Sequence, residues 1–247
     1  MFVTQRRLLA GLVGVLTTLA TVSGVLQAED KKAQHSAIKP AEHKGKGPEA
    51  RHQRFLERAK KGDVEVLFLG DSITQGWEGS GKEAWKKNFE PLKAANFGIG
   101  GDRTQHVLWR ITEGKELEGI TPKAAMLMIG TNNMGSNSAE EIADGVKAIV
   151  AELRRQKPNM KILVLGIFPR SPKANDKVRD KIKEVNKSIA KLDDGKNVKY
   201  LDIGEKFLEP DGSLSKNIMP DYLHLSKQGY QIWTDAVTPT LQDMLKK

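Results

Sequence analysis

The chain has 247 residues and a formal net charge of +9, and it contains no cysteine. This length allows one domain with an ample core plus a tail, and we expect no second full domain. Lack of cysteine excludes disulfides, thiolate metal sites and a cysteine nucleophile. Of the net charge, +2 lies on residues 1–28, +5 on residues 29–62 and +2 on residues 63–247. Because most of the basic excess lies outside the expected domain, we favour a solvated linker over a polyanion-binding tail and expect no nucleic-acid partner.

Residues 1–28 have the order of a secretory signal peptide. Arg6 and Arg7 precede an apolar stretch over residues 8–26, and cleavage is expected after Ala28. That places the protein outside the cytoplasm, secreted or periplasmic, with no stable membrane span after cleavage; a retained membrane anchor is the alternative. Residues 29–48 contain a single large aliphatic side chain, Ile38. They predict a flexible linker, because so little apolar area cannot offset the entropy of ordering.

From residue 49 to 247 the chain alternates between helix-like and strand-like segments. A short helix is expected over residues 51–61, ahead of the first strand. Apolar and β-branched runs predict strands at residues 64–69, 95–97, 124–129, 161–167 and 198–203. Helices are expected around residues 83–89, 104–112, 139–156, 177–192 and 227–245, and the third of these begins with a capping box, Ser138 and Glu141. This alternation predicts a three-layer α/β/α sandwich of about five parallel strands.

Polar and glycine-rich residues follow the predicted carboxyl ends of several strands. Ser72 comes directly after the first strand, and Asp221 and His224 come shortly before the last helix. Open parallel sheets bind their ligands at these strand ends. A serine hydroxyl becomes a useful nucleophile when an imidazole lies within hydrogen-bond reach and a third group orients the imidazole. Ser72, His224 and Asp221 supply those three groups.

Each of these motifs also has a structural explanation when it is taken alone. Gly-Asp-Ser is a common turn, and Asp221 and His224 could be a surface pair at a helix start. The glycines at 98–101 do not complete a dinucleotide-binding fingerprint, because Arg103 stands where its last glycine would fall. The joint occurrence of the motifs at strand ends favours catalysis over these separate explanations.

The joint pattern resembles the SGNH hydrolase superfamily, also called GDSL esterases, over roughly residues 49–245. Its four blocks match Gly70-Asp71-Ser72-Ile73, Asn96-Phe97-Gly98-Ile99-Gly100-Gly101, Gly130-Thr131-Asn132-Asn133 and Asp221-Tyr222-Leu223-His224. The run from 96 to 110 is most similar to the catalytic subunits of intracellular platelet-activating-factor acetylhydrolase. Two departures are Ile73, where the family name has leucine, and Asn133, where many relatives have Asp. The signal-like N-terminus also differs from the intracellular enzyme.

The resemblance implies a flavodoxin-like fold and a site made of five residues. Ser72 would be the nucleophile, His224 the base and Asp221 its orienter. The Ser72 N–H, the Gly101 N–H and the Asn132 side-chain amide would form the oxyanion hole. The implied activity is a serine esterase that cleaves short-chain, acetyl-type carboxylic esters through an acyl-enzyme on Ser72, without a cofactor.

Two other functions remain open on the same fold. A carbohydrate O-acetyl esterase fits an extracytoplasmic address, so the substrate is a small-molecule or a glycan ester. A catalytically silent binding module would have been free to lose any of the five site residues. The oligomeric state is not predicted, and a homodimer is possible.

Several other conspicuous side chains are expected outside the site. No H-x-H or H-E-x-x-H spacing argues for a catalytic metal. Four histidines are assigned to the tail, the leading helix or helix packing: His35, His43, His52 and His106. Trp77 and Trp85 either line the substrate pocket or belong to the core.

Overall fold

The computed structural model describes residues 35–246, and their central element is a five-stranded parallel sheet. Its strands are β1 (Val66–Gly70), β2 (Ala94–Gly98), β3 (Ala124–Met128), β4 (Lys161–Leu165) and β5 (Val198–Leu201). The strand order is β2-β1-β3-β4-β5, and every neighbouring pair is parallel. This confirms the α/β architecture and the five parallel strands expected from the alternating apolar segments.

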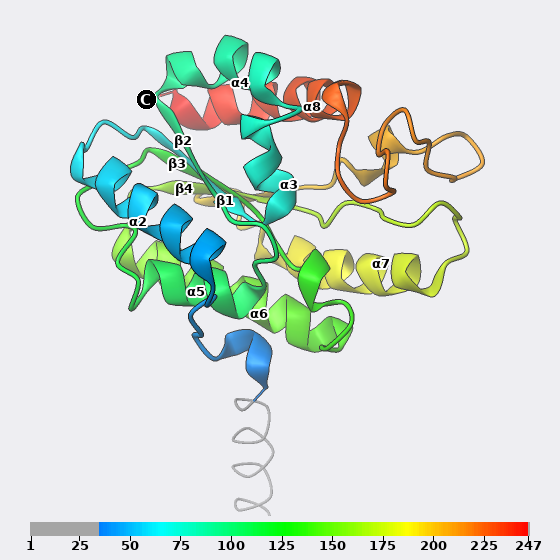
Figure 1. The fold of residues 1–247 in the computed structure, drawn as a ribbon, viewed down its shortest axis with the longest axis horizontal. Helices are drawn as coiled ribbons and strands as arrows, with labels where there is room; N and C mark the ends of the chain where they lie inside the picture. The colour runs from blue at the N-terminus through cyan, green and yellow to red at the C-terminus, as the bar shows by residue number, and fades with distance from the viewer. Residues whose placement is uncertain (1–34, 247) are drawn as a thin grey trace, which may run out of the picture. The chain divides into compact units, whose positions relative to one another are not determined.

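Helices connect the strands and cover both faces of the sheet (Figure 1). They are α2 (Lys46–Lys60), α3 (Ser72–Gln75), α4 (Lys82–Asn88), α5 (Thr104–Ile111), α6 (Ala139–Gln156), α7 (Lys177–Ile189) and α8 (Lys227–Leu245). Short 3-10 turns lie at η1 (Ser36–Ile38), η2 (Gly76–Glu78), η3 (Glu90–Leu92), η4 (Thr131–Asn133), η5 (Ala190–Leu192) and η6 (Gly204–Phe207). The predicted capping box is present: the Ser138 hydroxyl accepts from the Glu141 N–H, and the Glu141 carboxylate accepts from the Ser138 N–H.

Two apolar cores lie on opposite faces of the sheet. Alternate residues of a strand point to opposite faces, so Leu67 and Leu69 of β1 join the core beneath α2, α5, α6 and α7. Val66 and Phe68 join the other core, beneath α4 and α8, together with Trp77. Burial on both sides explains why the central strands are almost continuously apolar in sequence.

The strand order creates a crevice at the carboxyl end of β1. The chain runs from β1 to the edge strand β2 and then returns to β3 on the other side of β1. Such a switch point is where open α/β sheets bind ligands. The turn of α3 packs closely against the end of β2, since a Cβ on Gly98 would lie 2.3 Å from the Gln75 backbone nitrogen. Only glycine fits at Gly98 without moving the helix that begins with Ser72.

The structure differs from the linker predicted over residues 29–48. The compact unit begins at His35, and Ala37 is fully buried. The Thr104 hydroxyl donates to the Ala37 carbonyl at 2.8 Å, and the Ala41 N–H donates to the Gln105 carbonyl at 3.1 Å. These backbone contacts supply the stabilisation that the composition of the segment lacks. The predicted signal peptide and residues 29–34 lie outside the described residues.

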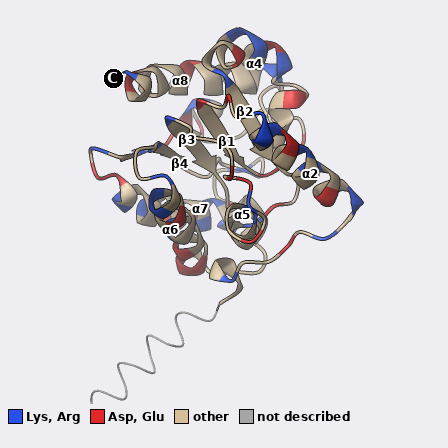
Figure 2. Cartoon of the chain, turned by 90° about the vertical axis from the view of Figure 1, so that its left-hand side faces the viewer, with Lys and Arg blue, Asp and Glu red and all other residues tan. Residues whose placement is uncertain are grey.

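Charged side chains of both signs are interleaved along the outer helices (Figure 2). On α6, for example, Lys147 pairs with Asp144 and Arg155 pairs with Glu152. Pairs of this kind at the surface contribute little to stability. Among residues 35–246, no helix has the length and apolar character needed to cross a membrane.

Candidate active site

Three side chains from opposite ends of the domain form a continuous chain of hydrogen bonds. Ser72 Oγ lies 2.8 Å from His224 Nε2, and His224 Nδ1 lies 2.6 Å from Asp221 Oδ2. The other Asp221 oxygen accepts from the backbone N–H of Leu223 at 3.0 Å and of His224 at 2.7 Å. Asp221 therefore fixes both the ring and the backbone of His224.

The contacts of Asp221 keep it ionised. Partial burial acts to raise the pKa of Asp221, but hydrogen bonds from the His224 ring and from the backbone of His224 and Leu223 outweigh it, so the pKa is lowered. An ionised carboxylate accepts a proton-bearing Nδ1, which leaves Nε2 free to accept from the Ser72 hydroxyl. The His224 side chain is 44% exposed and that of Asp221 is 56% exposed, so the pair lies at the protein surface.

Ser72 is the first residue of α3, and Asp71 caps this helix. One Asp71 oxygen accepts from the Ile73 N–H at 3.0 Å, whereas the other is buried and has no partner within residues 35–246. Burial raises the pKa of Asp71 to about 7, although the Ile73 hydrogen bond acts to lower it. Asp71 shapes the turn that presents Ser72, and its side chain is fully buried.

The loop after β2 and the turn after β3 lie beside Ser72. A Cβ on Gly100 would lie 3.8 Å from Ser72 Cβ, and the Gly100 N–H donates to the Gln75 side chain at 2.7 Å. Gly101 has a φ of +81°, a conformation that favours glycine. Its N–H meets no acceptor among residues 35–246.

Asn132, in η4, is held against the same loop. Its side-chain nitrogen donates to the Asp102 carbonyl at 2.9 Å, which leaves its second N–H available. The Ser72 N–H, at the first position of α3, has no acceptor within its own helix. Three donors, from Ser72, Gly101 and Asn132, thus come from three segments that border one another.

Sequence reasoning missed two side chains near this crevice. Arg170 follows β4 and donates to the Thr131 carbonyl and hydroxyl at 3.4 and 3.3 Å. His43, assigned to the tail, lies against Gly101, because a Cβ there would meet the His43 ring at 3.2 Å. The composition of the tail carried no signal for His43, since its position depends on backbone hydrogen bonds of the segment around it.

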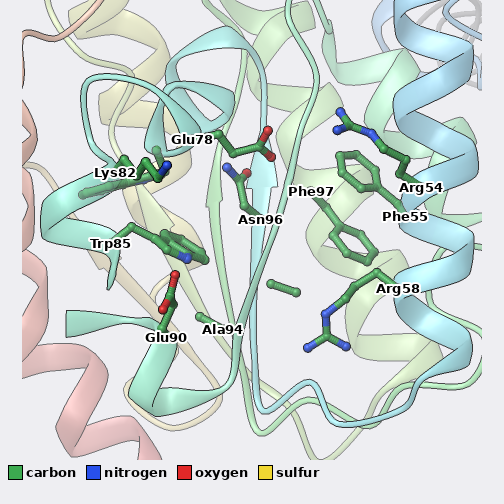
Figure 3. Close-up of a pocket in the computed structure, with 12 residues that line it drawn as sticks. Arg54, Phe55, Arg58, Glu78, Lys82, Trp85, Glu90, Ala94, Asn96 and Phe97 are labelled. Atoms are coloured by element: carbon green, nitrogen blue, oxygen red, sulfur yellow. The ribbon is translucent and has the colours of Figure 1, made fainter. Parts of the chain in front are cut away.

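The largest-scoring aromatic cluster of the sequence, around Trp77 and Trp85, is not part of the crevice. Trp77 is 1% exposed and packs among Phe68, Phe89 and Trp233, which makes it a core residue. Both tryptophans border a cavity of about 380 Å³ between α2 and α4, along β2. Figure 3 shows the labelled side chains on its two sides: Arg54, Phe55 and Arg58 of α2 opposite Lys82 and Trp85 of α4. None of the five predicted site residues lines this cavity.

The geometry suits acyl transfer. An imidazole bonded to a serine hydroxyl can take its proton as the oxygen attacks a carbonyl carbon. Backbone and amide donors next to that oxygen can stabilise the negative charge that develops on the carbonyl oxygen. None of these steps needs a cofactor.

Comparisons with known proteins agree with this chemistry. The model of the GDSL-like Lipase/Acylhydrolase family matches residues 68–232. The chain is 43% identical over 180 residues to the platelet-activating factor acetylhydrolase IB subunit alpha1 of Homo sapiens, covering 72% of this chain and 76% of the relative. It is 45% identical over 185 residues to the alpha2 subunit of Rattus norvegicus, covering 73% of this chain and 77% of the relative.

A solved structure shows the same fold at low sequence identity. The GDSL-like lipase from Bacteroides thetaiotaomicron superposes with a TM-score of 0.64 at 18% identity, covering 79% of this chain and 99% of that one. The family match and the two relatives, both well above 30% identity, lead to one conclusion. The chain belongs to the GDSL-like lipase/acylhydrolase family, within the SGNH hydrolases, and is a carboxylic ester hydrolase.

Proposed function

We propose that this ester hydrolase works through an acyl-enzyme on Ser72, with His224 as general base and Asp221 as its orienter. The observation that carries the proposal is the 2.8 Å contact between Ser72 Oγ and His224 Nε2. His224 takes the hydroxyl proton as Oγ attacks the ester carbonyl, and then returns it to the leaving alcohol. Water, activated by the same ring, releases the acid and regenerates Ser72.

The oxyanion hole in this proposal consists of the Ser72 N–H, the Gly101 N–H and the Asn132 side-chain amide. Support comes from the positive φ of Gly101 and from the hydrogen bond that holds Asn132 to Asp102. Donors fixed in advance cost no reorganisation when charge develops on the carbonyl oxygen.

The proposed substrates are esters with a short acyl group of the acetyl type. The relatives at 43% and 45% identity are acetylhydrolase subunits by name. A cavity of about 430 Å³ borders Gln75, Ile99 and Gly100, next to the residue that precedes Gly101. Its volume lies within the range of small-molecule sites, roughly 300–1,000 Å³, so it suits the larger, alcohol half of the ester.

A series of p-nitrophenyl esters of increasing acyl length tests this proposal. We expect kcat/KM to be highest for the acetate and to fall as the acyl chain lengthens. In the Ser72→Ala variant, hydrolysis should drop to near the uncatalysed rate at unchanged secondary structure. Equal rates for acetate and long-chain esters would contradict the acyl specificity, and retained turnover in Ser72→Ala would contradict the mechanism.

A second candidate is a carbohydrate O-acetyl esterase. The exposure of His224 and Asp221 at the surface favours it, because a polymer can reach an open site more readily than a deep one. Release of acetate from acetylated xylan, measured beside an acetylated phospholipid, distinguishes the two substrate classes. Faster release from the phospholipid would reject the carbohydrate candidate.

An exported protein is part of this second candidate. We propose that residues 1–28 direct secretion and are removed after Ala28. N-terminal sequencing of the protein recovered from its native host should then begin at Glu29. A mature chain that still starts at Met1 would contradict cleavage.

A further inference from the structure

The segment from His35 to Gly45 packs behind the loop that carries Gly101. Its turn η1 is held by the bond from Thr104 to the Ala37 carbonyl and by a bond of 3.0 Å from the Asn137 side chain to the Ser36 hydroxyl. The family model begins at residue 68, so the whole segment precedes the part of the chain that the family match covers. The segment nevertheless reaches the residues beside the proposed oxyanion hole.

His43 is the residue of this segment that lies nearest the hole. Its Nδ1 is 2.8 Å from Asp102 Oδ1, and a carboxylate has no proton to give, so the ring donates. The ring also stacks on that of His106, with centroids 4.5 Å apart. A Cβ on Gly101 would lie 3.2 Å from His43 Cε1 and 3.7 Å from Nε2, which places the ring edge over that glycine.

Asp102 links His43 to two of the proposed oxyanion donors. It directly follows Gly101, and its backbone N–H donates to the Ile99 carbonyl at 3.1 Å. Its own carbonyl accepts from Asn132 Nδ2 at 2.9 Å. Its carboxylate is fully buried between His43 and Arg110, whose Nε donates at 2.9 Å. The position of the Asp102 backbone therefore depends on how its carboxylate is held.

We propose that His43 is a positioning residue for the oxyanion hole: through the Asp102 carboxylate it fixes the Gly101–Asp102 backbone and, with it, the Asn132 amide. The inference rests on the proposed function and assigns the N-terminal segment to the active site. Without His43 the buried carboxylate keeps Arg110 as its partner but loses the donor on the side that faces Gly101. The loop then shifts, and misplacing a preorganised donor by about 1 Å can cost on the order of a hundredfold in rate.

The same three side chains could be read as a metal site, since ligand atoms of His43, Asp102 and His106 all lie within 4.8 Å of one another. Their hydrogen bonds favour the positioning role. His106 Nδ1 accepts from the Arg103 N–H at 3.1 Å, and His43 Nδ1 is taken by Asp102. The Arg110 guanidinium already neutralises the carboxylate that a cation would need.

The experiment compares three variants with the same ester substrate. His43→Ala removes the donor, and we expect kcat to fall about tenfold to a hundredfold while KM changes less than about threefold. His43→Asn carries a side-chain nitrogen at the same δ position as Nδ1, and it should recover most of the lost kcat. Lys44→Ala is the matched control, because Lys44 is the exposed neighbour of His43 in the same segment, and its kcat should equal that of the wild type.

A double-mutant cycle with Asn132→Ala separates positioning from general stability. If His43 acts through the hole, His43→Ala should cost much less in the Asn132→Ala background than in the wild type. Should His43→Ala fail to fold, His43→Gln takes its place in the cycle, because its amide lies one bond further from the backbone. Equal losses in both backgrounds would overturn the inference, as would wild-type kcat in the folded His43→Ala or Gln variant.

Two further results keep the inference distinct from the proposed function. Full activity of Asn132→Ala alone would reject the proposed oxyanion hole, whereas a loss there with no loss in His43→Ala would reject only the inference. Activity that a chelator abolishes and Zn²⁺ restores would make the three residues a metal site, and would also overturn the positioning role.

Discussion

Replacing Asn132 by Ala removes one oxyanion donor and one structural hydrogen bond, and the two effects can be estimated separately. Loss of a single oxyanion donor typically lowers kcat by ~10²- to 10³-fold, or ~2.7–4 kcal/mol in the activation free energy. The lost bond is the one from Asn132 Nδ2 to the Asp102 carbonyl, at 2.9 Å, and a bond of this kind contributes about 1 kcal/mol to stability. Since domains unfold with ~5–15 kcal/mol, Asn132→Ala should remain folded and yet be nearly inactive.

The neighbouring Asn133 provides the matched control. It is fully buried, it accepts from the Thr104 N–H at 3.0 Å, and it donates to Gln105 and Asn137 at 3.1 and 3.0 Å. With three bonds lost at about 1 kcal/mol each, Asn133→Ala should lose more stability than Asn132→Ala but less kcat. Urea unfolding and p-nitrophenyl acetate turnover measure both quantities. Full turnover in Asn132→Ala, or a greater loss of stability there than in Asn133→Ala, would refute the assignment.

Three further predictions follow from charged groups. Asp221→Asn should lower kcat/KM by less than loss of the serine nucleophile does, because His224 keeps its contact with that serine; an equal loss in ester assays would contradict this. For Asp71, whose pKa burial raises to about 7, the folded state holds a proton that the unfolded state releases, so the stability due to this group falls as pH rises between about 4 and 7. Asp71→Asn should remove that loss, so its free energy of unfolding relative to the wild type should increase from pH 5 to pH 8 in denaturant titrations; a constant difference would contradict the buried carboxyl. Arg110→Met should destabilise the protein by about 3–5 kcal/mol in urea, because it leaves two buried carboxylates without their cation; a change below about 1 kcal/mol would show that those carboxylates are not charged.

The sheet and most helices could be predicted because their signals are local. Strands buried on both faces produce continuous apolar runs, and a capping box marks the start of α6 at Ala139. Strand ends were less certain, since the sheet ladder stops at Leu165 and Leu201 although the apolar runs continue for two residues in each case.

The candidate site could be predicted in part. Ser72, Asp221 and His224 are separated widely in sequence, but each lies in a short motif at a strand end or before a helix, and parallel topology brings such ends together. His43 could not be predicted in this way, because a segment rich in Lys, Glu and Gly is ordered by backbone bonds to Thr104 and Gln105 that no composition reveals.

The most direct test of the central claim is to identify the residue that carries the acyl group during turnover. Rapid quenching with p-nitrophenyl acetate, followed by peptide mass spectrometry, should find acetyl on the peptide containing Ser72, together with a burst of p-nitrophenol. Acetyl on a different residue, or steady turnover without any acylated enzyme in a variant whose deacylation is slowed by Asp221→Asn, would contradict the account.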